Sequence, residues 1–140
     1  AQICENSRSL AAALVERGFR LGTGGSDNHL TLVDATSKGI TGHQLARAMD
    51  ASGLVCNRNL IPNDKGSAMR PSGVRLGTPA VTSRGFGSAE MTQIATWMER
   101  VAEVRGDADL DLDSRRQVYR EIAAQVRELC DRFPAPGVEA

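Results

Sequence analysis

The apolar positions at the start of the chain repeat with the period of a helix. In residues 1–17, Ile3, Leu10 and Leu14 fall on one face of a 3.6-residue turn, which predicts an amphipathic helix. Gly18 follows directly, and glycine is the residue that most often ends a helix. We therefore expect the first helix to end at Gly18.

The pattern then changes to the two-residue period of strands. Residues 19–21 alternate as a strand does, and residues 29–34 alternate with Leu30 and Leu32 on one face. The segment between them, residues 22–25, reads Gly-Thr-Gly-Gly and is typical of a turn. These two short strands are predicted to form a hairpin.

The middle of the chain predicts a capped helix and two further strands. Thr41 and Gln44 have the spacing of a capping box, so a helix is expected over residues 42–52, with Leu45 and Met49 buried. Beyond it the pattern predicts a strand, a long irregular loop and a second strand, over residues 54–56, 57–72 and 73–76.

Two longer helices are predicted toward the C-terminal end. Ser88 is expected to cap a helix that runs to about Arg105, with apolar residues at helical spacing along one side. A polar connection over residues 106–113 leads to a last helix over 114–132, which Pro134 ends. This order of elements predicts an α+β fold, with a small, mostly antiparallel sheet and helices packed on it.

Length and charge narrow the class of protein. The 140 residues are the length of one domain. The 17 Lys and Arg residues balance 17 Asp and Glu residues, so composition favours neither nucleic acid nor an anionic membrane as a partner. No apolar run approaches the ~20 residues of a membrane span, and no signal-peptide pattern is present. We expect a cytoplasmic protein.

Residues with reactive side chains are few. The chain has three cysteines, at Cys4, Cys56 and Cys130. An odd number without CxxC spacing argues against a disulfide framework and against a cysteine zinc site. His29 and His43 are too far apart for a helical metal pair, so no metal site is expected. Lys38 and Lys65 are the only amines for Schiff-base chemistry.

Arg75 is the strongest candidate for ligand binding on pattern alone. It lies between small and apolar residues on a predicted strand, next to a long polar loop. A guanidinium presents a planar fork of donors that suits a carboxylate, although a surface or structural salt bridge is the alternative. For Arg84, a structural ion pair is favoured over binding of a second phosphate or carboxylate.

Ordered motifs extend along nearly the whole chain. The most specific reads Arg70-Pro71-Ser72-Gly73-Val74-Arg75-Leu76-Gly77-Thr78-Pro79-Ala80-Val81-Thr82-Ser83-Arg84-Gly85-Phe86. The others lie at residues 24–34, 37–42, 56–59, 62–64 and 128–134. In these motifs the chain resembles the C-terminal domain of serine hydroxymethyltransferase, a pyridoxal-phosphate enzyme of the aspartate-aminotransferase fold type. The resemblance also implies that the helix over residues 1–17 continues from a large domain that precedes it.

The resemblance implies roles for two residues. In that family the arginine of the Ser-Gly-x-Arg-x-Gly-Thr-Pro motif clamps the α-carboxylate of the amino-acid substrate, and the matching residue is Arg75. The asparagine ahead of the proline in the Asn-x-Asn loop lies by the pteridine of the tetrahydrofolate cosubstrate, which places this role on Asn59. A carboxamide both donates and accepts, as a pterin edge requires. An Asx turn is the alternative for Asn59.

The resemblance also shows what this chain lacks. In the family, the lysine that holds pyridoxal 5'-phosphate lies in the large domain, and neither Lys38 nor Lys65 has a matching context. We therefore expect no catalytic and no cofactor-binding residue here, and no activity from this chain alone. The expected partner is the large domain or a subunit that carries it, in an enzyme that forms a homo-oligomer.

The function implied is transfer of a one-carbon unit between serine and tetrahydrofolate, with glycine as the other amino acid. Pyridoxal phosphate would supply the electron sink for the glycine carbanion. Two alternatives stay open at this point. One is a threonine transaldolase, an aldolase or an α-methylserine hydroxymethyltransferase of the same family. The other is a small domain without catalytic function, as a separate subunit or a fragment.

Overall fold

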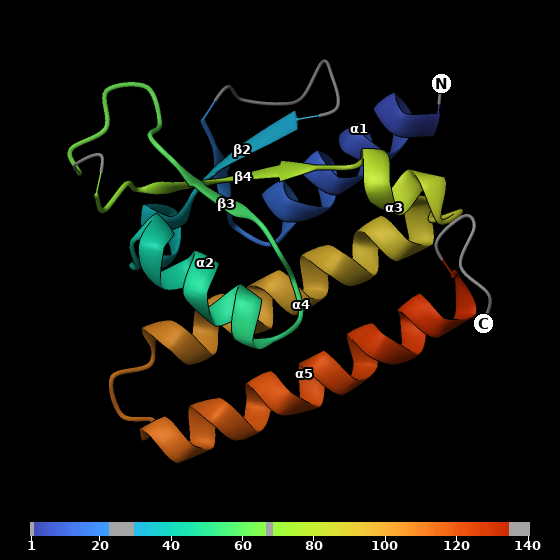
Figure 1. The fold of residues 1–140 in the computed structure, drawn as a ribbon. Helices are drawn as coiled ribbons and strands as arrows, with labels where there is room; N and C mark the ends of the chain where they lie inside the picture. Colours follow the sequence, from blue (N-terminus) through green and yellow to red (C-terminus); the bar gives the residue numbers. More distant parts are fainter. Residues whose placement is uncertain (1, 23–29, 67–68, 135–140) are drawn as a thin grey trace.

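The computed structural model describes residues 2–22, 30–66 and 69–134 (Figure 1). Its elements are, in chain order, α1 (Gln2–Glu16), β1 (Arg20–Leu21), β2 (Leu30–Asp34), the 3-10 helix η1 (Ala35–Lys38), α2 (Gly42–Ala51), β3 (Asn57–Asn59), β4 (Gly73–Gly77), α3 (Pro79–Ser83), α4 (Ser88–Gly106) and α5 (Leu112–Arg132). The predicted α+β class is confirmed.

The sheet has four strands in the order β1-β2-β4-β3, and each neighbouring pair is antiparallel. The pairing of β1 with β2 confirms the predicted hairpin, whereas its turn at residues 23–25 lies outside the described residues. β4 is an inner strand with a partner on both sides, and β3 is an edge strand. Arg75 in β4 stands opposite Leu32 of β2 and Asn57 of β3.

The helices form the other layer. In Figure 1, α4 and α5 run side by side below the sheet, and α4 also packs against α1 and α2. The predicted apolar stripe of α4 is buried along its length, with Met91, Ala95, Met98 and Val101 fully inaccessible. Burial of such a stripe is the main stabilising contribution of an amphipathic helix. The core therefore lies between the sheet and α4.

Local signals placed several helix ends correctly. Gly18 follows α1 with φ +86°, a conformation that glycine adopts without the steric cost of a Cβ. The capping box of α2 is present: the Gln44 N–H donates to Thr41 Oγ1, and the Thr41 N–H donates to Gln44 Oε1, both at 3.0 Å. Leu45 and Met49 are buried as expected.

The third strand does not lie at residues 54–56, where the apolar pattern predicted it. Residues 54–56 form no strand, and Val55 is 86% exposed. The strand is the polar segment Asn57–Asn59, which lies inside the stretch expected to be irregular. Cross-strand pairing with β4 outweighs the weak β-propensity of asparagine, because strand propensity depends largely on context.

Three smaller expectations also need correction. A helix, α3, follows Thr78 with Pro79 in its first turn, where proline loses no hydrogen bond. The N-cap of α4 is Gly87, whose N–H donates to Glu90 Oε2 at 2.8 Å, so Ser88 is not the cap. The last helix begins at Leu112, two residues early, because Asp111 caps it by accepting from the Ser114 N–H at 2.7 Å.

Candidate functional site

The two faces of the sheet differ in chemistry. Residues directly opposite on neighbouring strands point to the same face, and successive residues of one strand point to opposite faces. In β4, Val74 and Leu76 are buried against the helices, whereas Arg75 between them is exposed. The pairing places Asn57 on the face of Arg75, and Asn59 two residues further along the same strand shares it. This open face carries both residues that the sequence singled out.

The Arg75 guanidinium has no carboxylate partner among the described residues. The ion pairs that these residues form join Arg17 to Glu16, Arg20 to Asp34 and Arg100 to Glu121. The salt-bridge alternative for Arg75 therefore finds no support in the described part of the chain. A free planar fork of donors on an exposed strand can bind a carboxylate through two parallel hydrogen bonds.

Arg20 and Asp34 show what a paired arginine looks like on this sheet. Asp34 lies at the end of β2, and the Arg20 Nε donates to its Oδ2 at 2.8 Å. Burial raises the pKa of Asp34, but hydrogen bonds from Thr36 and Arg20 outweigh burial and hold the pKa below its ordinary value. The Asp34 carboxylate is thus occupied by hydrogen bonds from Arg20 and Thr36 within the fold.

Asn59 lies half-buried at the end of β3. Its Nδ2 donates to the Leu60 carbonyl at 3.0 Å, which uses one donor within the loop. Its side-chain oxygen has no hydrogen-bond donor among the described residues. Diagonal neighbours on a sheet face are about 7 to 8 Å apart, so one small molecule can reach both Asn59 and Arg75.

Asp64 organises the loop that follows Asn59, and the sequence reading missed it. Its carboxylate accepts from the N–H groups of Ile61, Gly66 and Ser72 and from the Ser72 hydroxyl. These hydrogen bonds, led by those from Ser72, hold the pKa of Asp64 far below its ordinary value. The signal in the sequence was the turn-forming Pro62-Asn63-Asp64, and Asn63 indeed has a positive φ of 59°.

The surroundings of β3 are electropositive. Arg58 alternates to the other face of β3 and contacts Nδ1 of His43 from α2. Partial desolvation, followed by the charges of Arg58, Arg47 and Arg70, lowers the pKa of His43. Arg58 and His43 lie on the side of β3 toward α2, not on the open face of Arg75 and Asn59.

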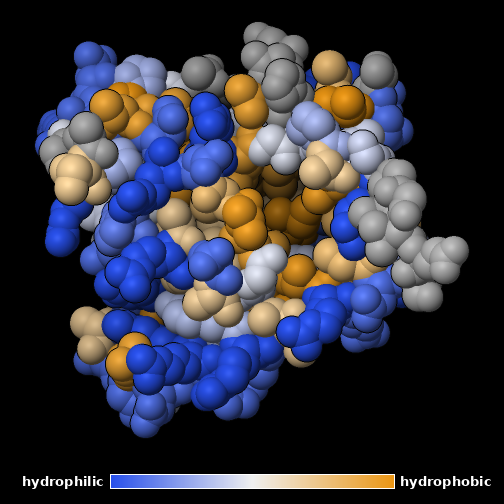
Figure 2. Space-filling model, in the orientation of Figure 1, coloured by the Kyte–Doolittle hydropathy of each residue, from blue (hydrophilic) through white to orange (hydrophobic). Residues whose placement is uncertain are grey.

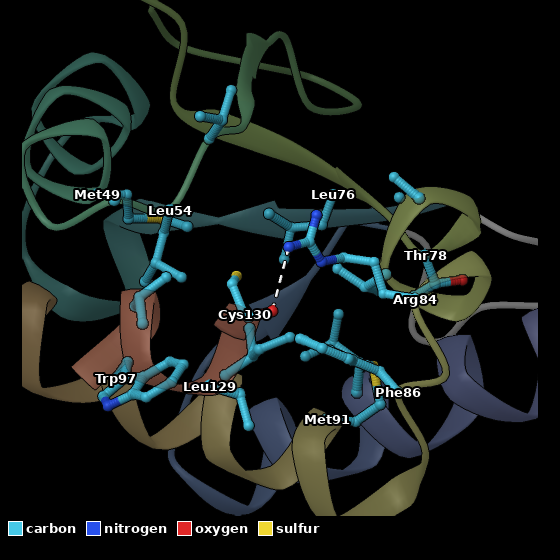
Figure 3. A pocket seen from close by; sticks show the side chains of 18 residues that line it. Met49, Leu54, Leu76, Thr78, Arg84, Phe86, Met91, Trp97, Leu129 and Cys130 are labelled. Atoms are coloured by element: carbon cyan, nitrogen blue, oxygen red, sulfur yellow. Dashed lines mark hydrogen bonds between the residues drawn. The ribbon is translucent and has the colours of Figure 1, made fainter. Parts of the chain in front are cut away.

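An apolar hollow lies on the opposite side of β4. It has a volume of about 310 Å³ and is lined by Leu76, Phe86, Met91 and Trp97 among others (Figure 3). Figure 2 shows it as an apolar depression surrounded by hydrophilic side chains. Arg75 is not among its lining residues. The hollow and the open face are therefore separate features.

Arg84 extends across this hollow from the end of α3 (Figure 3). Its Nη2 donates to the Cys130 carbonyl at 3.3 Å, and no carboxylate among the described residues pairs with it. The expected structural ion pair finds no support among the described residues, where a backbone carbonyl of α5 accepts from Arg84 instead. Its buried Nε lacks an acceptor in the described part of the structure.

Neither lysine is placed to hold pyridoxal phosphate. Lys38 Nζ donates to the Arg17 carbonyl and lies 5.0 Å from the centre of the Phe19 ring. Lys65 is exposed on the loop after Asp64. Lys38 is therefore engaged within the fold, and Lys65 lies on the surface.

Other reactive groups are also scarce in the described ranges. Burial raises the pKa of the Cys56 thiol to about 11, which keeps it protonated and inert. No cluster of three His, Cys, Asp or Glu side chains that could hold a metal occurs among the described residues. Within the same residues, no helix is long and apolar enough to cross a membrane.

These features define a small α+β domain in which one open sheet face carries a carboxamide and an arginine that has no carboxylate partner among the described residues. The family model described as serine hydroxymethyltransferase matches residues 1–98 of the chain. The chain belongs to the serine hydroxymethyltransferase family.

Individual relatives carry the similarity through the last helix. The chain is 50% identical over 139 residues to a serine hydroxymethyltransferase of Desulfotalea psychrophila, which covers 99% of the chain and 31% of the relative. It is 51% identical over 137 residues to that of Sorangium cellulosum, covering 98% and 30%. The corresponding enzyme of Acidothermus cellulolyticus is 49% identical over 139 residues, covering 98% and 32%. The chain thus spans about a third of the length of these relatives.

Proposed function

We propose that this chain is the C-terminal part of a pyridoxal-phosphate-dependent serine hydroxymethyltransferase that transfers a one-carbon unit between serine and tetrahydrofolate. The observation that carries the proposal is the exposed Arg75, which lacks a carboxylate partner among the described residues. It stands in the family motif Ser72-Gly73-Val74-Arg75-Leu76-Gly77-Thr78-Pro79. In this proposal Arg75 binds the α-carboxylate of serine or glycine.

The geometry of β4 supports a clamp. An inner strand is bonded on both sides, so its backbone is held more firmly than that of an edge strand. Arg75 needs to move only its side chain to meet a ligand on the open face. Two parallel charge-assisted hydrogen bonds would fix both the position and the plane of the carboxylate.

Asn59 is proposed to contact the pterin of tetrahydrofolate. Its free side-chain oxygen can accept from a pterin N–H, and its second amide hydrogen can donate.

Catalysis is proposed to require the remaining two-thirds of a full-length enzyme. Pyridoxal phosphate supplies the electron sink for reactions at the α-carbon when bound, and its attachment is assigned to that part. The large domain or a subunit that carries it is therefore the proposed partner. Assembly as a homo-oligomer and a cytoplasmic location belong to the same proposal.

The test is a glycine titration of the full-length enzyme loaded with pyridoxal phosphate, followed by the change in cofactor absorbance. Arg75→Ala should weaken glycine binding by roughly 2 to 5 kcal/mol, the range for truncating one member of a buried charge pair. Arg75→Lys keeps the charge but loses the fork, so it should recover only part of this loss. The amount of bound cofactor should be the same in all variants.

Arg58→Ala is the matched control, because Arg58 is an exposed arginine on the neighbouring strand that alternates to the other face. Its glycine curve should follow the parent enzyme. Superimposable glycine titration curves for the parent, Arg75→Lys and Arg75→Ala would contradict the proposal that Arg75 binds the substrate carboxylate.

A further inference from the structure

The connection between β3 and β4 is long for two strands that pair directly. Residues 60–72 join Asn59 to Gly73, which stand opposite each other in the sheet. A long loop by itself specifies strand register poorly, because register in hairpins is normally fixed by a short turn. Another feature must hold the two ends of this loop together.

Asp64 makes the connection between the two ends. Its Oδ2 accepts from the Ile61 N–H at 3.1 Å and from the Ser72 N–H at 2.9 Å. Its Oδ1 accepts from the Gly66 N–H and from the Ser72 Oγ, both at 2.6 Å. Ile61 lies two residues after Asn59, and Ser72 directly precedes β4. One carboxylate therefore joins the segment that leaves β3 to the segment that enters β4.

The Ser72 end of this link is itself anchored to the rest of the fold. The Ser72 carbonyl accepts from the Ala35 N–H at 2.9 Å, and the neighbouring Pro71 carbonyl accepts from the Gly42 N–H at 3.0 Å. Pro71 and Ser72 are buried. Asp64 thus ties the segment that leaves β3 to Ser72, which is bonded to η1 and lies next to Pro71, itself bonded to α2.

The two ends of the loop are also in close contact at Gly73. A Cβ added to Gly73 would lie 2.6 Å from Ile61 Cγ2 and 2.9 Å from the Asn59 carbonyl oxygen. Such distances are shorter than real Cβ contacts, so the backbone of Asn59 and the side chain of Ile61 lie directly on Gly73. The side chain of Ile61 and the backbone of Asn59 are thus both packed on the same residue of β4.

Asn59 and Arg75 depend differently on this link. β3 has only three residues and pairs with one strand, β4, although α2 also packs against it, so fewer backbone hydrogen bonds fix Asn59 than fix Arg75. Arg75 lies in the middle of β4 and is paired with Leu32 of β2 as well as with β3. Loss of the link should displace Asn59 and leave Arg75 in place.

We propose that Asp64 is a positioning residue that sets the Asn59 carboxamide on the open face through its bonds to Ile61 and Ser72. The inference rests on the proposed function for the identity of the ligand, tetrahydrofolate. Asp64 itself is not assigned a contact with the ligand. Asp64 holds Asn59, the proposed folate contact, in position. Arg75, the proposed carboxylate contact, is held by the sheet itself.

The first experiment measures tetrahydrofolate and glycine affinity separately in the full-length enzyme. Asp64→Ala should weaken tetrahydrofolate binding by about three- to tenfold, comparable to losing one hydrogen bond, with glycine binding changed by less than about twofold. Ser72→Ala removes only the hydroxyl donor and should give a smaller effect in the same direction. An equal loss for both ligands, or no loss for either, would overturn the proposal.

Asp111→Ala is the matched control. Asp111 also accepts a backbone hydrogen bond, from Ser114 at 2.7 Å, but it lies at the start of α5. Its loss should leave both affinities at the parent values. A folate loss in Asp111→Ala equal to that in Asp64→Ala would mean that general destabilisation, rather than positioning, causes the effect.

The double variant Asn59→Ala with Asp64→Ala tests whether the two residues act together. If Asp64 acts through Asn59, the double variant should bind tetrahydrofolate no more weakly than Asn59→Ala alone. Fully additive losses would contradict positioning through Asn59.

Hydrogen exchange separates this inference from the proposed function. In the full-length enzyme, Asp64→Ala should increase amide exchange in residues 57–61 several-fold while residues 73–77 stay protected. If Asn59→Ala leaves folate binding unchanged but this exchange pattern is found, the folate function fails and the positioning of β3 by Asp64 stands. Unchanged exchange at residues 57–61 would overturn the positioning whatever the ligand.

Discussion

The helix-facing side and the open side of the sheet use the same strands for different purposes. Toward the helices, β2 and β4 present Val33, Val74 and Leu76, all buried against the core. Toward the open side, the alternate positions of β3 and β4 present Asn59 and Arg75. The two-residue period of a strand thus separates groups that stabilise the fold from groups available for binding.

This difference between the two sides predicts which substitutions should change the stability of the fold and which should change ligand binding. A buried apolar side chain contributes mainly by leaving water, and its loss leaves a cavity in a closely packed core. An exposed arginine without a carboxylate partner among the described residues is expected to contribute little to folding, because surface substitutions usually change stability by less than about 0.5 kcal/mol. Stability and binding are therefore expected to respond independently on the two sides.

The largest effect is expected on the helix side. Met98 is fully buried at the centre of α4, and Met98→Ala should lower the free energy of unfolding by about 2 to 5 kcal/mol. Arg75→Ala should change it by less than about 0.5 kcal/mol. Urea unfolding, followed by the fluorescence of the only tryptophan, Trp97, measures both. A comparable loss of stability in the two variants would break the division between the two sides.

A smaller effect is expected on binding at the open side. Asn59→Ala should weaken tetrahydrofolate binding of the full-length enzyme by about 1 kcal/mol, the typical net value of one hydrogen bond, with glycine binding nearly unchanged. Gln93→Ala removes an exposed carboxamide from α4 instead and serves as the control. Equal folate affinity in Asn59→Ala and the parent would favour the transaldolase alternative.

The smallest effect concerns pH on the helix side. Tyr119 is buried, its hydroxyl has no partner among the described residues, and burial raises the pKa of that hydroxyl. A raised folded-state pKa gives stability that is complete below the unfolded value near 10 and is lost as the pH rises through the folded value. Tyr119→Phe should keep the neutral-pH stability and flatten this alkaline loss in urea unfolding. An unchanged alkaline slope would exclude Tyr119 as its source.

Much of the fold could be predicted because its signals are local. The capping box at Thr41 and Gln44, the glycine after α1 and the apolar stripe of α4 each depend on residues within a few positions of one another. The antiparallel pairing of β1 with β2 followed from alternation on both sides of a short turn segment. Arg75 was singled out as a candidate from a local pattern too, an arginine between small and apolar residues on a predicted strand beside a long polar loop.

The sequence by itself therefore determined the four longer helices α1, α2, α4 and α5, the fold class and the family to which the chain belongs. The tertiary structure alone decided that polar Asn57–Asn59, rather than apolar residues 54–56, is a strand. It also decided that Arg84 bonds the Cys130 carbonyl and that Asp64 joins Ile61 to Ser72. Each of these depends on a partner brought close by folding, because hydrogen bonds between distant segments leave no periodic pattern along the chain.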